Sequence, residues 1–209
     1  MPRLTEVRLS VRIPASRALA VLGAFLCGLV LVFGAIVHFA GRPGSPIGSA
    51  IAGVGGSFHL EDQNGKPVSD QDLKGEPFLV FFGFTHCPDI CPTTLFEMSE
   101  VMKKLGKDAD RTGALFITVD PERDTPAALK DYLSNFDPHL RGLTGDPAAV
   151  NAALKAYRVY AKKIPLKDGD YTMDHTAAVY LMDKDGHFVA LFNLKQTPEA
   201  AADQLRGYL

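Results

Sequence analysis

One apolar segment near the middle of the chain constrains the fold more than any other feature. Residues 78–84 read Phe-Leu-Val-Phe-Phe-Gly-Phe. An uninterrupted apolar run of this length, rich in aromatic residues, predicts a central strand that is buried on both faces. The run leads almost directly into Cys87 and then Cys91. The sequence therefore predicts that a pair of thiols lies at the end of the central strand.

A proline follows each of the two cysteines, as Pro88 and Pro92. Proline pushes the preceding residue toward extended backbone, which is the conformation of a helix N-cap. We expect a helix to begin here with Cys91 at its cap, and the helix dipole to lower the pKa of that thiol below its usual value of about 8.5. Three later helices are expected to begin in the same way, at Thr125-Pro126, Asp146-Pro147 and Thr197-Pro198.

The spacing of Cys87 and Cys91 allows two kinds of chemistry. In a tight turn, cysteines four apart can reach the Cα separation of roughly 5.5–6 Å that suits a disulfide, either redox-active or structural. A structural disulfide here would close a very short loop and stabilise little. The same approach lets both sulfurs bind one metal ion. Thiolates favour Cu(I) or zinc, whereas an iron–sulfur cluster usually needs four cysteines and the chain has only Cys27 besides these two.

Residues 18–40 predict a membrane anchor, because these 23 residues contain no Lys, Arg, Asp or Glu. As a helix they would extend about 34 Å, enough to cross a bilayer core of about 30 Å. Four arginines precede the segment and only Arg42 follows closely, so residues 1–17 are expected to form a cytoplasmic basic tail. A cleaved signal peptide is the alternative, but its apolar region is normally about 7–15 residues long and no convincing cleavage site follows. We therefore expect a single pass through a bacterial cytoplasmic (inner) membrane, with the C-terminal domain in the periplasm.

Residues 41–57 are rich in Gly, Pro, Ser and Ala and predict a flexible linker. The remaining residues, 58–209, are numerous enough for one domain with its own core. Without residues 1–57, which hold five Arg and one Glu, the chain keeps 17 basic and 23 acidic residues, a net charge of −6. An acidic domain is an improbable nucleic-acid partner, so none is expected.

The pattern within residues 58–209 alternates between strands and helices. A hairpin around Asn64-Gly65 comes first, and the central strand, a helix ending at Gly106 and a strand at 114–119 follow. Later elements are a helix to about Phe136, a strand at 140–143, a helix at 147–157, strands at 176–182 and 187–194, and a helix from Pro198. Strand–helix alternation implies parallel pairing, and this order predicts an α/β, thioredoxin-like fold.

Residues 159–173 interrupt this order and predict a projecting hairpin with its turn at Asp168-Gly169. The segment carries several lysines. These could form a docking surface, or they could simply be a solvated face of the hairpin.

Three motifs together resemble the Sco/SenC family. They are Cys87-Pro88-Asp89-Ile90-Cys91-Pro92, the stretch from Val119 to Pro126, and Asp174-His175 before an apolar strand. The resemblance covers residues 58–209, and the predicted anchor also matches. It implies a thioredoxin-like, copper-binding protein that helps to assemble the binuclear copper centre of cytochrome c oxidase. It also implies that Cys87, Cys91 and His175 are the copper ligands and that the copper-accepting oxidase subunit is a partner.

The residues themselves support His175 less strongly than the cysteines, because a lone histidine is more often structural than a ligand. His86 is nearer in sequence, but a residue adjacent to Cys87 in an extended chain points the opposite way. In a thioredoxin-like fold the loop before the penultimate strand approaches the cysteine turn, and His175 is expected in that loop. Imidazole also suits Cu(II). Asp174 and Asp89 could support the ligands, or they could be ordinary exposed turn residues.

Two functions of different classes remain open. The first is a copper-binding metallochaperone, and the second is a thiol–disulfide oxidoreductase or peroxidase that uses Cys87 and Cys91 as its redox-active pair. The three-residue spacer and the absence of a proline at Asp174-His175-Thr176 favour the first. Cysteines in an oxidising compartment tend to form a disulfide, which cannot hold Cu(I), so a reductant of thioredoxin type is also expected as a partner. A purely structural interaction domain would leave the paired motif unexplained.

Overall fold

A computed structural model describes residues 28, 29, 32, 53–167 and 169–209 of the chain. The predicted cytoplasmic tail (1–17), nearly all of the predicted anchor (18–40) and linker residues 41–52 lie outside the described residues. Among the described residues, no helix has both the length and the apolar character that a membrane crossing requires. Contacts group residues 51–209 into one compact unit, which contains every element discussed below.

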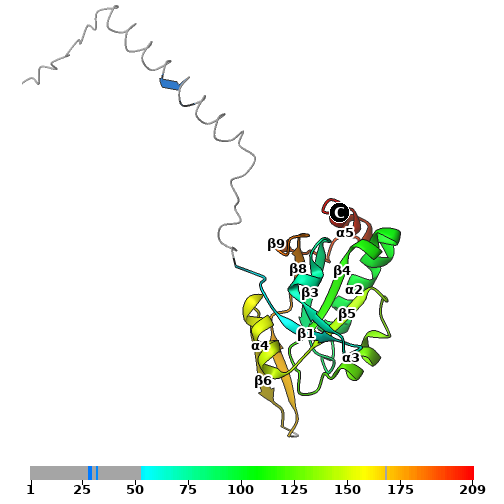
Figure 1. Cartoon of the computed structure of the whole chain (residues 1–209), viewed down its shortest axis with the longest axis vertical. Helices are drawn as coiled ribbons and strands as arrows, with labels where there is room; N and C mark the ends of the chain where they lie inside the picture. Colours follow the sequence, from blue (N-terminus) through cyan, green and yellow to red (C-terminus); the bar gives the residue numbers. More distant parts are fainter. Residues whose placement is uncertain (1–27, 30–31, 33–52, 168) are drawn as a thin grey trace, which may run out of the picture. The chain divides into compact units, whose positions relative to one another are not determined.

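A seven-stranded mixed sheet forms the centre of this unit, in the order β2-β1-β5-β4-β3-β8-β9. Its strands are β1 (His59–Asp62), β2 (Pro67–Ser69), β3 (Phe78–Gly83), β4 (Gly113–Thr118), β5 (Leu140–Thr144), β8 (Val179–Met182) and β9 (Phe188–Leu191). The three middle strands β3, β4 and β5 are parallel, and the other pairs are antiparallel (Figure 1). The predicted α/β architecture with parallel pairing at its centre is confirmed.

The central strand β3 is buried at every residue, as its apolar run predicts. On one face, the Phe81 ring lies 6.0 Å from the Phe116 ring, and Phe116 in turn lies 5.9 Å from Tyr132. On the other face, Phe82 lies 5.3 Å from Tyr157. A strand with aromatic packing on both sides needs a helical layer on each, which is the usual setting of parallel strands.

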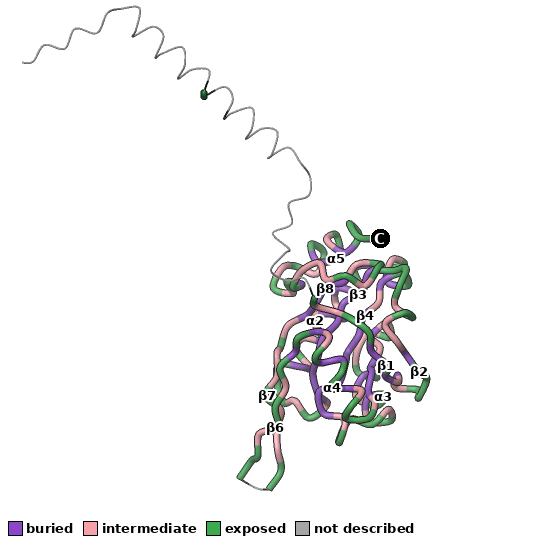
Figure 2. Tube along the Cα trace, turned by 60° about the vertical axis from the view of Figure 1, so that its left-hand side comes forward, coloured by how far each residue is buried: buried purple, intermediate pink, exposed green. Residues whose placement is uncertain are grey.

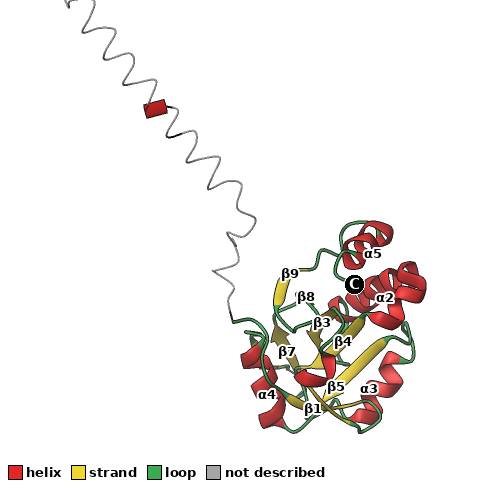
Figure 3. Ribbon diagram, turned by 45° about the horizontal axis from the view of Figure 1, so that its top comes forward, coloured by secondary structure: helices red, strands yellow, loops and turns green. Residues whose placement is uncertain are grey.

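Four α-helices supply these layers. They are α2 (Ile90–Leu105), α3 (Pro126–Leu133), α4 (Pro147–Ala156) and α5 (Pro198–Arg206). Figure 3 shows α2, α3 and α5 together on one side of the sheet and α4 on the other. Two short 3₁₀ helices, η2 (Asp70–Leu73) and η3 (Gly106–Arg111), complete the connections. One face of α2 is buried, with Leu95, Met98, Val101, Met102 and Leu105 at helical spacing.

Three of the helices begin where the sequence predicts. The side chains of Thr125, Asp146 and Thr197 cap α3, α4 and α5 by accepting a hydrogen bond from a backbone N–H three residues later, and a proline occupies the first turn each time. Proline fits there because its missing N–H has no partner within the helix in any case.

Strands β6 (Ala161–Pro165) and β7 (Tyr171–His175) form a separate two-stranded sheet. This is the predicted projecting hairpin, and Figure 2 shows it extending beyond the buried strands with an exposed tip. Its second strand is longer than expected. His175 is the last residue of β7, so the prediction that it lies in a loop was wrong.

We expect Asp146→Ala to destabilise the domain by about 1 kcal/mol, because the N–H of Ala149 loses its side-chain acceptor. Urea unfolding measures the change. Asn151→Ala, an exposed position on the same helix, is the matched control and should leave stability within about 0.5 kcal/mol. Equal effects of the two substitutions would contradict the capping role.

Candidate metal centre

Two cysteines and one histidine from distant parts of the chain meet at one end of the sheet. One possible ligand atom each of Cys87, Cys91 and His175 lies within 4.8 Å of the others. The Cys91 Sγ is 3.8 Å from the Nε2 of His175, across 84 residues of sequence. Both cysteines are free thiols. The structure thus brings together all three residues that the resemblance implies as ligands.

Helix α2 begins two residues earlier than predicted. Ile90 and Cys91 are already helical, and Asp89 occupies the N-cap position without a side-chain cap. The prediction of Cys91 as the cap was wrong, because Pro92 is accommodated in the first helical turn despite its effect on the preceding residue. The Cys91 N–H instead donates to the Cys87 Sγ at 3.4 Å. Cys87 therefore presents its sulfur to the start of the helix.

Cys91 is completely buried, with 0% of its surface exposed. Burial raises the pKa of its thiol, and the neighbouring Cys87 raises it further. The predicted lowering of this pKa was wrong, because Cys91, although it lies in the first turn of α2, is buried, and loss of hydration disfavours the thiolate. Cys91 is accordingly a protonated thiol at neutral pH, and a metal ion that binds there has to displace the proton.

Gly83 makes room for the buried sulfur. A Cβ at this position would lie 2.8 Å from the Cys91 Sγ and 2.6 Å from the Phe116 ring. Such contacts are too short for any side chain, so glycine is required where β3 meets α2. This role of Gly83 was not predicted, although a lone glycine inside an apolar strand is a known sign of close approach.

His175 presents an unprotonated nitrogen to the cysteines. Its Nδ1 is 3.2 Å from the backbone carbonyl of Thr176, and since a carbonyl can only accept, Nδ1 carries the hydrogen. Burial lowers the pKa of His175, and this outweighs the opposing effects of the Thr176 carbonyl and the Asp174 charge. The imidazole is therefore neutral at neutral pH, with the lone pair of Nε2 directed at Cys91.

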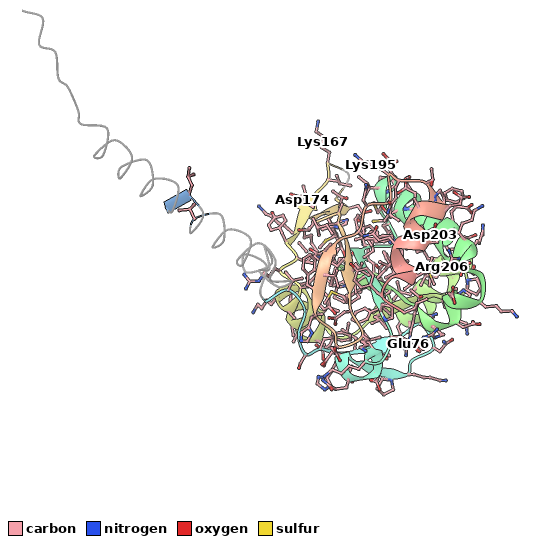
Figure 4. All side chains as sticks on the ribbon, turned by 90° about the horizontal axis from the view of Figure 1, so that it is seen from above. Glu76, Lys167, Asp174, Lys195, Asp203 and Arg206 are labelled. Atoms are coloured by element: carbon pink, nitrogen blue, oxygen red, sulfur yellow. The ribbon has the colours of Figure 1, made fainter. Side chains whose placement is uncertain are left out.

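A shallow depression of about 300 Å³ opens onto this group of residues. Its wall includes Phe84, whose ring is perpendicular to the His175 imidazole at 5.8 Å. Its rim includes Ile90, which is 51% exposed. Asp89 and Asp174 also lie on this rim and are exposed (Asp174 is labelled in Figure 4). Cys87 is half-buried and is the cysteine that can be reached from solvent.

None of the other histidines that the structure describes joins the cluster. His86 is exposed and its Nδ1 faces the Thr85 hydroxyl at 3.0 Å. His139 contacts Asp137 and Asp110. His187 lies beside Asp183 and Asp185 at the β8–β9 turn. His59 is exposed in β1, and His38 and Cys27 are outside the described residues.

A buried carboxylate holds the segment that precedes Cys87. Asp124 accepts hydrogen bonds from the Thr85 N–H at 3.1 Å, from the Thr85 hydroxyl at 2.6 Å and from the Thr118 hydroxyl at 2.6 Å. Its side chain is inaccessible to solvent, and burial raises the pKa of its carboxyl group. From the sequence, Asp124 is predicted only as part of the motif from Val119 to Pro126, without a role of its own. The available signal was an acidic residue in the loop that follows a buried strand, six residues beyond Thr118.

The donor set suits a soft or borderline metal ion. Two thiolates favour Cu(I) or zinc, and one imidazole nitrogen extends the range to Cu(II). Ordered hydrogen bonding to the other imidazole nitrogen, here from Nδ1 to the Thr176 carbonyl, is the usual arrangement around a histidine ligand.

Comparison with known proteins decides the family, because the family model described as SCO1/SenC matches residues 49–209. The chain belongs to the SCO1/SenC family. A SCO2-like protein of Rickettsia felis is 40% identical over 156 residues, which are 74% of this chain and 76% of that protein.

Solved structures agree with this family assignment. The structure of Bradyrhizobium japonicum ScoI with copper bound is 67% identical, with a TM-score of 0.74, and the match covers 75% of this chain and 99% of that one. BsSco, described as a member of the Sco family of cytochrome c oxidase assembly proteins with a disulfide switch, is 27% identical with a TM-score of 0.59 over 75% and 94% of the two chains. The predicted thioredoxin-like fold is confirmed by these matches.

The two thiols should differ strongly in reactivity. In the reduced, metal-free protein we expect iodoacetamide to modify Cys87 much faster than Cys91, because Cys91 is buried and its pKa is raised. The rate at Cys91 should still be rising above pH 9, since its thiolate forms only at higher pH. Mass-spectrometric mapping of each site measures the rates, and urea-unfolded protein, in which both should react alike, is the control. Faster modification of Cys91 would refute the buried-thiol description.

Proposed function

We propose that this protein is a membrane-anchored copper metallochaperone that assists assembly of the binuclear copper centre of cytochrome c oxidase. The observation that carries the proposal is the convergence of Cys87, Cys91 and His175 within 4.8 Å in a chain of the SCO1/SenC family. A relative that is 67% identical was solved with copper bound. Another relative is described as belonging to a family of oxidase assembly proteins.

In this proposal, copper is the cargo of the site. The Cys87 and Cys91 thiolates hold Cu(I) in a near-linear arrangement, and the His175 Nε2 completes the coordination of Cu(II), which prefers nitrogen ligands and tetragonal geometry. The Nδ1–H of His175 is already committed to the Thr176 carbonyl, which leaves Nε2 free for the metal. Binding at Cys91 expels a proton, so affinity should rise with pH.

The partners follow from the surface of the site. The shallow depression beside Cys87 leaves the donors within reach of a docked protein, and we assign that position to the copper-accepting subunit of the oxidase. Loss of the two thiols to a disulfide would remove the sulfur ligands, so a thiol reductant of thioredoxin type has to act before copper loading.

The proposed location is the bacterial inner membrane. Residues 18–40 anchor the chain in a single pass, residues 1–17 remain in the cytoplasm, and the linker 41–57 connects the anchor to the periplasmic copper-binding domain, residues 58–209. The charge difference across the apolar segment supports this orientation.

A thiol–disulfide oxidoreductase is the second candidate, acting on cysteines of the oxidase subunit or of other extracytoplasmic proteins. It is favoured by the arrangement of a half-buried Cys87 beside a buried Cys91, which matches an attacking thiol and a resolving thiol. A relative with a disulfide switch points the same way. The raised pKa of Cys91 and the His175 nitrogen aimed at its sulfur favour metal binding instead.

Copper titration of the reduced protein tests the metallochaperone. We expect one copper ion per chain in the wild type. Cys87→Ser and Cys91→Ser should lose Cu(I) affinity by more than the roughly 10- to 100-fold cost of losing a residue that only supports a ligand. His175→Ala should keep Cu(I) but lose the thiolate-to-Cu(II) absorption band, and His86→Ala is the control that should keep both. Full binding in both serine variants would overturn the copper proposal.

Insulin reduction tests the alternative function. The reduced protein should turn over slowly beside a typical thioredoxin, because the thiol that would resolve the mixed disulfide is buried and protonated at neutral pH. The assay is run with and without copper. Thioredoxin-like rates independent of copper would move the assignment to the oxidoreductase.

A further inference from the structure

The strand that carries His175 is not part of the main sheet. Within the described part of the chain, β7 pairs only with β6, in a two-stranded sheet. A two-stranded hairpin is only marginally stable by itself in water. The position of His175 relative to the cysteines therefore depends on side-chain contacts between this hairpin and the rest of the domain. Met173 packs against the core and His175 against Phe81 and Phe84, and the loop Asp120–Thr125 after β4 adds polar contacts.

Arg123 makes the central contact. Its Nη1 donates to the backbone carbonyl of Tyr171 at 3.0 Å, at the start of β7. Its guanidinium carbon lies 3.8 Å from the centre of the Tyr171 ring. The Tyr171 hydroxyl donates to Asp120 at 2.9 Å, and Arg123 Nε donates to the other oxygen of the same carboxylate at 2.5 Å. Arg123, Asp120 and Tyr171 thus form a closed group that links the loop to β7.

This group is shielded from solvent, which distinguishes it from an ordinary surface ion pair. The Asp120 side chain is 2% exposed and that of Arg123 is 16% exposed. Charge-assisted hydrogen bonds in such a setting are stronger than exposed ones. Lysine cannot reproduce them, because donation to a carboxylate and a carbonyl together with ring stacking requires the planar guanidinium.

Arg123 also reaches the imidazole through one further ring. Its guanidinium carbon is 5.8 Å from the centre of the Phe84 ring, and that ring packs perpendicular to His175 at 5.8 Å. The next residue of the loop, Asp124, holds the cysteine side of the site through Thr85. Neighbouring residues therefore hold the two sides of the site separately, Arg123 the histidine and Asp124 the cysteines.

We propose that Arg123 is the positioning residue for His175, and that it thereby determines how well the site holds Cu(II) relative to Cu(I). The inference rests on the proposed copper site. Two thiolates satisfy Cu(I) without the histidine, whereas Cu(II) needs the imidazole nitrogen in place. Loosening the hairpin therefore weakens the binding of Cu(II) more than the binding of Cu(I), although Arg123 itself contacts none of the three ligand residues.

Lys163 provides a matched control on the same hairpin. Its ammonium nitrogen lies 3.9 Å from the Tyr171 ring centre and 2.6 Å from Glu122. Both members of that ion pair are largely exposed, so it contributes little to holding the hairpin. Arg141→Lys controls for the general cost of replacing an arginine, because Arg141 pairs with the buried Asp62 in a different part of the sheet.

The experiment compares Arg123→Lys, Lys163→Gln and Arg141→Lys with the wild type as full-length, reduced protein. Cu(II) binding is followed by the thiolate-to-Cu(II) band and by nitrogen hyperfine splitting, and Cu(I) affinity by competition with a chelator. Arg123→Lys should weaken Cu(II) binding by about 10- to 100-fold and leave Cu(I) affinity unchanged. In the metal-free protein it should also speed amide exchange at residues 172–175 but not in β3. Arg141→Lys should behave as the wild type, and Lys163→Gln, which loses one exposed contact to the Tyr171 ring, should weaken Cu(II) binding far less than Arg123→Lys.

The possible results distinguish the positioning role of Arg123 from the proposed copper function. Equal loss of both oxidation states, or no loss of either, would overturn the role of Arg123. Absence of copper binding in the wild type would overturn the proposed function, and amide exchange at residues 172–175 would then decide the positioning role by itself. Should Arg123→Lys fail to fold, Tyr171→Phe removes only the hydroxyl donated to Asp120 and should shift both readouts in the same direction by a smaller amount.

Discussion

The burial of one sulfur atom governs the rest of the site. The Cys91 Sγ packs where a side chain on Gly83 would have to stand, at the carboxyl end of the central strand. Because β3 and β4 are parallel, their carboxyl ends meet at the same edge of the sheet, and the loop after β4 necessarily lies beside the cysteine turn. That proximity allows Asp124 to bind Thr85 and Arg123 to bind Tyr171. The topology of the sheet thus places the loop that carries Arg123 and Asp124 beside the metal-binding residues.

The charges around the site are arranged for a neutral metal-free state. Cys91 is kept as a thiol by burial, and His175 is kept as a neutral imidazole by burial, which outweighs the opposing effect of its hydrogen bond to Thr176. A buried thiolate without a cation would be costly, and a bound metal ion supplies that cation. Ionisation of Cys91 is therefore coupled to metal binding, so that the thiol releases its proton when the metal ion binds.

Local signals in the sequence predicted those parts of the structure that depend on neighbouring residues. Capping residues before Pro126, Pro147 and Pro198 marked three helix starts correctly, and the apolar run marked the buried strand. The failures have a different cause. The predicted start of α2 was wrong because tertiary packing of Cys91 against Gly83 overrides the local preference imposed by Pro92. The predicted pKa of the Cys91 thiol was wrong for the same reason, because this packing buries the sulfur. The contacts of Arg123 and Asp124 join residues about 40 to 50 apart, so no local pattern could show them.

Access to the donors is asymmetric, and this restricts how the proposed function can operate. Cys91 is fully buried, whereas Cys87 is half-buried on the wall of the open depression, with the exposed Ile90 at its rim. A reductant that attacks a disulfide and a protein that accepts copper both need a sulfur they can reach, and Cys87 is that sulfur for each of them. The two partners must therefore use the same approach and cannot be bound at once. Reduction and copper transfer would then occur in sequence, with complete dissociation of the first partner before the second can dock.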